Sequence, residues 1–251
     1  MGGFNSRQAV MAGASAHAAA LNVRKKALYV ASHMLEVGEQ ALEIEGKMVK
    51  LRGSDRGVSL ADIARGVAGL PGYYIPGGVS PGLASTEHVI INDMTYANGS
   101  AVVEIEIDIE TGVTRVTRVV FAHDCGRMLH PKIVEGQIIG GIVHGIGNAL
   151  YEFMAFDEAG QPLATTFTDY ALARAGDAPR IEIVHLESPT PLNELGIKGV
   201  GESGVIPMTA AIASAIEDAL SPFGARVTKT PLAPPDILAL IAGDRKSTRL
   251  N

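Results

Sequence analysis

Residues 101–122 read Ala-Val-Val-Glu-Ile-Glu-Ile-Asp-Ile-Glu-Thr-Gly-Val-Thr-Arg-Val-Thr-Arg-Val-Val-Phe-Ala, and they decide the fold of the larger part of the chain. From Val103 to Glu110, apolar residues alternate with acidic ones, which places one face of a strand in a core and the other in water. Thr111-Gly112 predicts a turn into a second strand, so the pair forms a long antiparallel hairpin. That second strand leads into Asp124-Cys125-Gly126.

Downstream of the hairpin, the apolar spacing becomes helical over Ile133–Phe153. This predicted helix contains Gly136, Gly140, Gly141, Gly145 and Gly147. A glycine inside a helix costs roughly 1 kcal/mol relative to alanine, so we expect another element or a ligand to press against the exposed backbone. The sequence also predicts a strand and two further helices, at Ile181–Leu186, Ala210–Leu220 and Pro235–Ala242. Hairpins mixed with helices, without regular βαβ alternation, indicate an α+β fold with mixed or antiparallel sheets and packed helices.

Upstream, residues 6–38 are predicted to be helical, with Gly38 marking the end. Ala41–Ile44 and Met48–Leu51 suggest a small hairpin, and Ser59 with Asp62 predicts a capping box that opens a short helix over Leu60–Arg65. Residues 66–82 hold three prolines and six glycines and read as a loop. We therefore expect a helical segment with a hairpin insert over 1–82, a main α+β domain over 83–243, and a disordered or foreign tail over 244–251.

The composition restricts the class of protein. The 251 residues are 47% hydrophobic and 19% charged, with a net charge of −6, which argues against nucleic acid as a partner. No run of eighteen apolar residues could span a membrane, and the N-terminus lacks signal-peptide features, so we expect a cytoplasmic protein. Cys125 is the only cysteine, which excludes an internal disulfide and a cysteine-bound iron–sulfur cluster within this chain. His88, His123 and His130 show no metal-ligand spacing.

One acidic residue stands in an unusually glycine-rich loop. Residues 196–204 read Gly-Ile-Lys-Gly-Val-Gly-Glu-Ser-Gly, and glycines at this spacing let the backbone approach a bulky ligand closely. A carboxylate at Glu202 that such a ligand covered would lose water and could act as a general base. The alternative is a surface turn with a solvated glutamate.

Three other segments accompany this loop. They are residues 3–13 (Gly-Phe-Asn-Ser-Arg-Gln-Ala-Val-Met-Ala-Gly), 121–137 (Phe-Ala-His-Asp-Cys-Gly-Arg-Met-Leu-His-Pro-Lys-Ile-Val-Glu-Gly-Gln) and 138–152 (Ile-Ile-Gly-Gly-Ile-Val-His-Gly-Ile-Gly-Asn-Ala-Leu-Tyr-Glu). In this order, the four segments resemble the C-terminal half of the molybdenum-binding large subunit of the xanthine dehydrogenase and aldehyde oxidase family, most closely the carbon monoxide or aldehyde dehydrogenase type. The resemblance covers about residues 2 to 243.

The resemblance implies that Glu202 is the catalytic base and that the molybdenum cofactor, molybdopterin, lies against the four segments. The implied cofactor-binding residues are Asn5, Ser6, Arg7, Asp124, Cys125, Gly126, Gln137, His144, Lys198, Gly199 and Gly201. No protein side chain is expected to bind the metal, which the pterin dithiolene holds. The nucleotide form of the cofactor, including a cytosine dinucleotide, stays open.

Each of these residues also has a simpler interpretation. Ser6 and Arg7 could form a plain helix cap with a solvent-facing arginine, and Cys125 could be a small buried apolar residue. His144 departs from the glutamine found in much of the family, and it contacts the cofactor or fills the core. Gln137 could be an ordinary surface glutamine, and Lys198 either steers a cofactor phosphate or is solvated.

The implied activity is oxidative hydroxylation of an aldehyde, an N-heterocycle or a related electron-poor carbon, with water as the oxygen source. Electrons would leave through [2Fe-2S] clusters and FAD on an iron–sulfur subunit and an FAD subunit, because this chain has neither the cysteines nor a dinucleotide fingerprint. The family's N-terminal half of the large subunit is not in this sequence, so we expect an incomplete chain that is inactive alone. The alternative function is a non-catalytic module that binds cofactor or assembles subunits.

Overall fold

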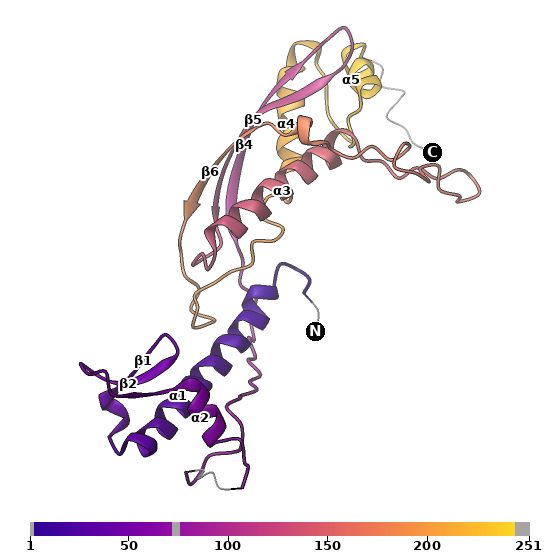
Figure 1. Ribbon diagram of the computed structural model, residues 1–251. Helices are drawn as coiled ribbons and strands as arrows, with labels where there is room; N and C mark the ends of the chain where they lie inside the picture. The colour runs from indigo at the N-terminus through magenta and orange to yellow at the C-terminus, as the bar shows by residue number, and fades with distance from the viewer. Residues whose placement is uncertain (1–2, 72–75, 244–251) are drawn as a thin grey trace. The chain divides into compact units, whose positions relative to one another are not determined.

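The computed structural model describes residues 3–71 and 76–243, so the expected tail at 244–251 lies outside the described part (Figure 1). The chain divides into two compact units. The smaller unit is Met11–Asn92, and the larger unit combines Met1–Val10 with Asp93–Asn251. The N-terminal motif that contains Ser6 therefore belongs to the same unit as Glu202.

The smaller unit is built on one long helix. A π-helical turn, Ala9–Gly13, leads into α1, Ala14–Leu35. The predicted end at Gly38 is wrong, because Glu36 adopts the left-handed conformation with φ 54° and ends the helix earlier. The Ser32 carbonyl accepts from the backbone N–H of Val37, which satisfies one of the helix's last carbonyls.

A three-stranded antiparallel sheet packs beside α1 in this unit. Its strands are β1 (Leu42–Glu45), β2 (Met48–Leu51) and β3 (Gly57–Ser59), in the order β1-β2-β3. The short helix α2, Leu60–Gly66, begins where predicted because the Ser59 hydroxyl accepts from the Asp62 N–H at 3.0 Å. Residues of α1, β1, β2 and α2 form one buried core: Ala27, Val30, Ala31, Leu42, Val49, Ile63 and Val67.

The division between the units falls at Asn92/Asp93 rather than at the predicted 82/83. The intervening segment belongs to the smaller unit because Leu83 packs against its core and Glu87 accepts a hydrogen bond from Asn22 of α1 at 2.6 Å. Glycine and proline content marked the loop but gave no information about these contacts.

The larger unit contains the predicted hairpin. Strand β4 (Asn98–Ile107) pairs antiparallel with β5 (Thr114–Asp124), and Gly112, with φ 75°, occupies the turn. Strand β6 (Arg180–Leu186) pairs parallel with β5, so the sheet has the order β4-β5-β6 and is mixed.

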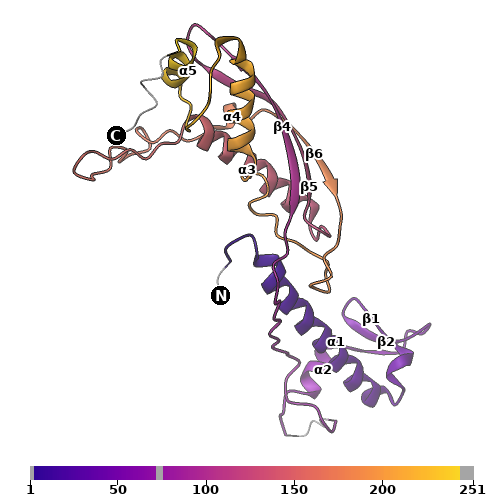
Figure 2. The same cartoon turned by 180° about the vertical axis from the view of Figure 1, so that it is seen from behind.

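Three helices accompany this sheet: α3 (Pro131–Leu150), α4 (Met208–Ala219) and α5 (Pro234–Ile241). Short 3-10 turns lie at Glu39–Ala41 in the smaller unit and at Ala175–Asp177 and Ser221–Phe223 in the larger one. His130 caps α3 by accepting from the Ile133 N–H, and Pro131 occupies the first helical position. Helices α3 and α4 lie along the sheet in both the front and the back view (Figure 2).

The core of the larger unit lies between these helices and the sheet. Phe121 of β5 is fully buried with three isoleucines of α3 and two of α4: Ile138, Ile142, Ile146, Ile212 and Ile216. Burying a side chain of this size stabilises the fold by roughly 1.5–3 kcal/mol. The predicted α+β class is confirmed. Over the described residues, no helix combines the length and apolar character needed to cross a bilayer.

Candidate functional site

The larger unit brings Ser6 and Glu202 together across 196 positions of sequence. The Ser6 hydroxyl donates to Glu202 Oε2 at 2.7 Å and accepts from the Glu202 backbone N–H at 2.9 Å. The other carboxylate oxygen, Oε1, accepts no hydrogen bond from the described residues, and the glutamate is exposed. The loop therefore presents one oriented carboxylate with a free oxygen.

The Ser6 turn has an unusual backbone that fits closely against the glycine loop. Asn5 and Ser6 both have φ 54°, a left-handed conformation that costs a non-glycine residue roughly 1–2 kcal/mol. A Cβ at Gly199 would lie 2.6 Å from the Ser6 carbonyl oxygen, and one at Gly201 would lie 3.3 Å from Ser6 Oγ. Gly199 is thus needed by the contact with Ser6, and Gly201 lies close against the Ser6 side chain. Arg7 stacks on Phe4, with its guanidinium carbon 4.8 Å from the ring centroid.

The Asp124–Gly126 turn is attached to the other end of the glycine loop. The Lys198 N–H donates to the Cys125 carbonyl at 2.8 Å, and the Arg127 N–H donates to the Gly196 carbonyl at 3.0 Å. Gly126 has φ 65°, and a Cβ there would overlap the Gly196 carbonyl. The turn therefore fixes the loop that carries Glu202.

A buried ion pair reinforces this attachment. Lys198 Nζ lies 3.3 Å from Asp124 Oδ1, and only 10% and 9% of the two side chains are exposed. The solvated interpretation of Lys198 is therefore wrong. Burial on its own would raise the pKa of Asp124, but hydrogen bonds from Ser188, Gly126 and Lys198 outweigh it and lower the pKa to about 2.

This pKa predicts an acid-dependent contribution to stability. The folded-state pKa of Asp124 lies below its ordinary value of 3.8, so the stabilisation is complete above about pH 4 and is lost as the pH falls toward 2. We expect the difference in unfolding free energy between wild type and Asp124→Asn to shrink by about 2 kcal/mol over that range. Urea unfolding at a series of pH values measures it, and a constant difference would contradict it.

Cys125 points into the core. Its side chain is 2% exposed and belongs to the main apolar cluster, and burial raises the pKa of its thiol. The structure thus agrees with the simpler interpretation, a small buried apolar residue. Its backbone carbonyl, rather than its sulfur, contacts the loop.

Four of the five glycines of α3 fall into two groups, whereas the fifth, Gly147, lies against Glu152, whose carboxylate a Cβ there would overlap. Gly141 and Gly145 face the loop after Glu202: a Cβ at Gly141 would lie 2.9 Å from the Val205 nitrogen, and one at Gly145 would overlap Met208. Gly204 is equally tight, since its Cβ would overlap the Ile138 carbonyl. The predicted packing of this helix against the Glu202 loop is confirmed for these positions.

Gly136 and Gly140 are different, because a Cβ at either position would meet no atom within 4 Å beyond its chain neighbours and the nearby backbone of α3 itself. Both are exposed, and they share a helix face with Gln137 and His144, which are also exposed. His144 is thus not a core residue. We call the exposed surface of α3 at Gly136 and Gly140 the bare face. The Gln137 amide oxygen would be 3.7 Å from a Cβ on Gly201, which places the bare face beside the Glu202 loop.

A second cluster of polar side chains includes His123, the residue before Asp124. Sequence reasoning did not find this cluster. His123 Nε2 lies 2.7 Å from His185 Nδ1, and His185 Nε2 lies 3.5 Å from Glu135 Oε1. His123 is 1% exposed, and burial together with His185 lowers its pKa. The two histidines are paired across β5 and β6, and that register is not readable from either strand alone.

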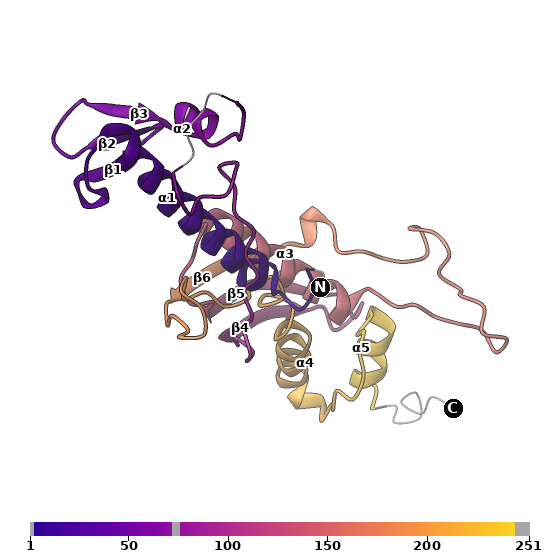
Figure 3. The ribbon, with the colours of Figure 1, turned by 90° about the horizontal axis from the view of Figure 1, so that it is seen from below.

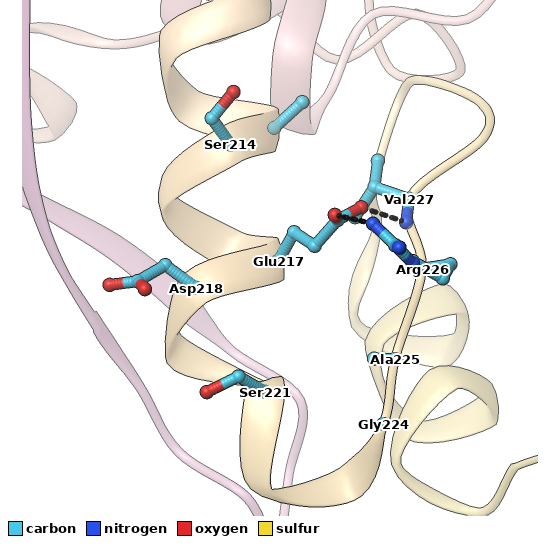
Figure 4. A pocket seen from close by; sticks show the side chains of 9 residues that line it. Ser214, Glu217, Asp218, Ser221, Gly224, Ala225, Arg226 and Val227 are labelled. Atoms are coloured by element: carbon cyan, nitrogen blue, oxygen red, sulfur yellow. Dashed lines mark hydrogen bonds and ion pairs between the residues drawn. The ribbon is translucent and has the colours of Figure 1, made fainter.

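Two hollows in the larger unit lie away from these residues. One, of about 520 Å³, faces the C-terminal half of α4, where Glu217 accepts from Arg226 and from the Val227 N–H (Figure 4). The other, of about 650 Å³, lies beside Thr114–Thr117 of β5 and Tyr151. Neither is lined by Glu202 or Ser6.

The predicted site residues therefore meet in part. Ser6, Glu202, Gly199, Gly201 and Gln137 are in or near contact, and the Asp124–Gly126 turn reaches them through Lys198. His144 shares the bare face of α3 with Gln137, and Asn5 is exposed next to Ser6.

The exposed side of α3 offers space and hydrogen-bonding groups at one surface. Gly136 and Gly140 leave a helix face without side chains, and Gln137 and His144 border it with hydrogen-bonding groups. Within the described ranges, no three His, Cys, Asp or Glu side chains are grouped closely enough to hold a metal ion.

Comparison with known proteins identifies the family of this chain. A family model described as a molybdopterin cofactor-binding domain matches residues 1–179. The nicotine 6-hydroxylase large subunit of Paenarthrobacter nicotinovorans is 38% identical over 96% of this chain and 30% of its own length. The carbon monoxide dehydrogenase large chain of Hydrogenophaga pseudoflava is 36% identical over 89% of this chain and 28% of its own.

A solved structure shares the fold. Quinoline 2-oxidoreductase from Pseudomonas putida 86 superposes with a TM-score of 0.82 at 37% identity, covering 95% of this chain and 30% of that one. This chain thus spans about 30% of the length of the relatives it matches. The chain belongs to the family of molybdopterin cofactor-binding domains.

Proposed function

We propose that this chain forms part of the active site of a molybdenum hydroxylase, with Glu202 as the general base. The observation that carries the proposal is the reciprocal pair of hydrogen bonds between Ser6 and Glu202, which orients a carboxylate beside the bare face of α3. The reaction we propose is hydroxylation of an electron-poor carbon with water as the oxygen source. We favour an N-heterocycle as substrate because two relatives have nicotine and quinoline in their names.

The cofactor, when bound, supplies the redox chemistry through its molybdenum. The chain's own contribution begins with Glu202, whose Oε1 is free to accept a proton while Ser6 holds Oε2. Ser6 thereby fixes the direction of the carboxylate, and the Lys198–Asp124 pair fixes the loop beneath it. A cofactor over this exposed glutamate would exclude water from it and strengthen its interactions.

We propose that Gln137, His144 and the Ser6–Arg7 turn bind the cofactor, with Gly136 and Gly140 providing the surface it covers. Gln137 has both a donor and an acceptor, and His144 has a donor in either tautomer. Asn5 precedes Ser6 in this turn, and we propose that it too lies at the cofactor-binding surface. Asp124, Cys125, Gly126, Lys198, Gly199 and Gly201 would act by shaping the Glu202 loop.

The remaining partners follow from the size of the relatives. This chain corresponds to about 30% of their length, so we propose that further large-subunit polypeptide completes the site and that electrons pass to iron–sulfur and FAD subunits. We propose a cytoplasmic location. Mass spectrometry of the released cofactor would distinguish a cytosine dinucleotide from the other nucleotide forms.

A non-catalytic cofactor-binding or assembly module is the second candidate, because Glu202 is exposed in the chain as it stands. Molybdenum content and dye reduction, measured with the completing polypeptide present, separate the two. Stoichiometric molybdenum with steady substrate-dependent reduction supports the hydroxylase, whereas molybdenum without reduction supports the module. If residues 1–251 alone turned over substrate as fast as they do with the completing polypeptide, no further polypeptide would be needed.

The bare face of α3 gives a prediction with opposite effects on stability and binding. Gly140→Ala should raise the free energy of unfolding by up to about 1 kcal/mol, because the new methyl meets open space and removes a helix-interior glycine. The same methyl should lower cofactor occupancy if the cofactor lies on this face. Thermal unfolding and molybdenum analysis measure the two effects, with Gly176→Ala, also in open space, as the control. Unchanged occupancy would remove this face from the proposed site.

A further inference from the structure

Two histidines face each other near the ends of the parallel strands β5 and β6, which run side by side in the front, back and bottom views (Figures 1, 2 and 3). His123 and His185, here called the histidine pair, form the last register pair but one. Nε2 of His123 lies 2.7 Å from Nδ1 of His185, and the ring of His123 stacks within 5° of parallel on that of Phe121. Neither histidine takes part in the chemistry proposed for Glu202.

The contacts of the histidine pair assign its protons. A neutral imidazole carries one proton, so one ring nitrogen donates and the other accepts. Nε2 of His185 lies 3.5 Å from Glu135 Oε1, and a carboxylate attracts an N–H and repels a lone pair, which places the proton of His185 on Nε2. Nδ1 of His185 is then the acceptor, and His123 donates to it from Nε2. This leaves Nδ1 of His123 without a proton, which agrees with its having no hydrogen-bond partner in the described part of the chain.

The surroundings of His123 oppose a positive charge. The residue is 1% exposed, and Gly99, its partner on β4, has no side chain to face it. The other charged groups near the histidine pair are Glu135 on α3 and Asp124, the next residue of β5. Burial and the neighbouring His185 lower the pKa of His123 below its ordinary value of 6.5, against a weaker raising effect of Asp124. His123 is therefore neutral at neutral pH.

Proton uptake disrupts this arrangement. Solvent reaches the pair at His185, whose side chain is 23% exposed. A protonated His185 donates from both nitrogens, so its Nδ1 presents a hydrogen to Nε2 of His123. His123 then has to accept at Nε2 and carry its own proton on Nδ1, where the buried N–H finds no acceptor. Because an unpaired buried donor is unfavourable, a bound proton weakens the contact between the two rings.

The ends of these strands hold the Glu202 loop. Asp124, the last residue of β5, accepts at Oδ1 from the Ser188 N–H at 3.2 Å, and Ser188 lies just after the end of β6. The same oxygen lies 3.3 Å from Lys198 Nζ, and the Lys198 N–H donates to the Cys125 carbonyl at 2.8 Å. Lys198 belongs to the glycine loop that carries Glu202. Separation of β5 from β6 at the histidine pair therefore loosens the attachment of that loop.

We propose that the histidine pair and Glu135 form an acid-sensitive contact that controls how firmly the Glu202 loop is held. While both rings are neutral, the chain from His123 through His185 to Glu135 keeps the ends of β5 and β6 together. When the pair takes up a proton from solvent, the strand ends part and the loop becomes mobile. This device acts within the polypeptide and does not depend on cofactor binding or on the role proposed for Glu202.

Nitrogen NMR tests the proton assignment. In the full chain labelled with ¹³C and ¹⁵N, long-range ¹H–¹⁵N correlations at about pH 7.5 should show both members of the histidine pair as Nε2–H tautomers. The ring signals are assigned through their correlations to the backbone. An Nδ1–H tautomer or an imidazolium at His123 would contradict the arrangement.

Hydrogen exchange tests the effect on the loop. Between about pH 7.5 and about pH 5, the protection factor of the Lys198 N–H, corrected for the intrinsic effect of pH on exchange, should fall about tenfold in the wild-type chain. The direction follows from the lowered pKa of His123, because the opened chain takes up a proton near its ordinary pKa of 6.5 whereas the closed pair resists it. The loss therefore begins well above the range in which Asp124, with its pKa of about 2, is protonated.

Two variants remove the titratable contact and keep a hydrogen bond. In His123→Gln, the amide can donate to His185 Nδ1 or rotate to accept from it, so both protonation states are accommodated. In His185→Asn, the amide oxygen can accept from His123 Nε2 but takes up no proton. Each variant should lose less than about twofold of its Lys198 protection over the same range. His88→Gln, at an exposed histidine of the smaller unit, is the matched control and should behave like the wild type.

Two results of the exchange experiment would overturn the proposal: no acid-induced loss in the wild-type chain, or a loss of equal size in the wild type and in both variants. Thermal unfolding checks that each variant is folded, and the wild-type tautomers test the proposal even where a variant is not. Because exchange is measured without cofactor or substrate, the proposal can fail while Glu202 remains the base. Retained turnover in a Glu202→Gln variant would, conversely, leave the histidine pair unaffected.

Discussion

A Glu202→Gln variant of the completed, cofactor-loaded protein should lose turnover by about 10²–10⁴-fold or more while keeping its molybdenum. The amide has nearly the same volume as the carboxylate, and its oxygen can still accept from Ser6, so the loop should be preserved. What the variant lacks is a group that accepts a proton at neutral pH. Steady-state dye reduction gives kcat, and metal analysis gives occupancy.

Glu110→Gln is the matched control, since Glu110 is an exposed acid in the turn between β4 and β5. It should leave both kcat and molybdenum content unchanged. Comparable turnover in Glu202→Gln would exclude Glu202 as the base, and parallel loss of molybdenum would instead assign it to cofactor binding.

Gly204→Ala should destabilise the larger unit by roughly 1–3 kcal/mol and reduce cofactor content with it. The new methyl would overlap the Ile138 carbonyl and lie 3.0 Å from the Ile142 nitrogen, both of which are backbone atoms of α3. Since a backbone cannot rotate away as a flexible side chain can, the helix and the Glu202 loop must separate.

Chemical unfolding of Gly204→Ala against Gly176→Ala measures this effect, because Gly176 has open space around it and a Cβ there should be harmless. Equal stability of the two variants would show that α3 and the loop are not in the close contact described. Retained stability with lost cofactor would locate the effect in the site alone.

Sequence predicted the parts of the fold that depend on nearby residues. Alternation gave β4 and β5, and helical spacing gave α3, because each pattern reports which face of one element is buried. The end of α1 was misplaced because Glu36, an unusual residue for the left-handed conformation, ends the helix before the glycine that normally would.

The site was only partly predictable for the same physical reason. Ser6 and Glu202 were connected through resemblance to a family, since no local pattern links positions 196 residues apart. The Lys198–Asp124 ion pair forms because the Glu202 loop packs against the Asp124 turn. The His123–His185 contact depends on the register of the parallel strands β5 and β6. Both are tertiary facts that no single segment encodes.

The contact between Ser6 and Glu202 also sets an order of events during synthesis. A ribosome must translate nearly the whole described chain after Ser6 before its partner exists, and closing so long a loop is entropically unfavourable and slow. The nascent chain can fold the smaller unit and the β4–β5 hairpin from contacts already available. The contact between Ser6 and Glu202, by contrast, can form only after Glu202 has left the exit tunnel, so it is among the last contacts of the larger unit to become available.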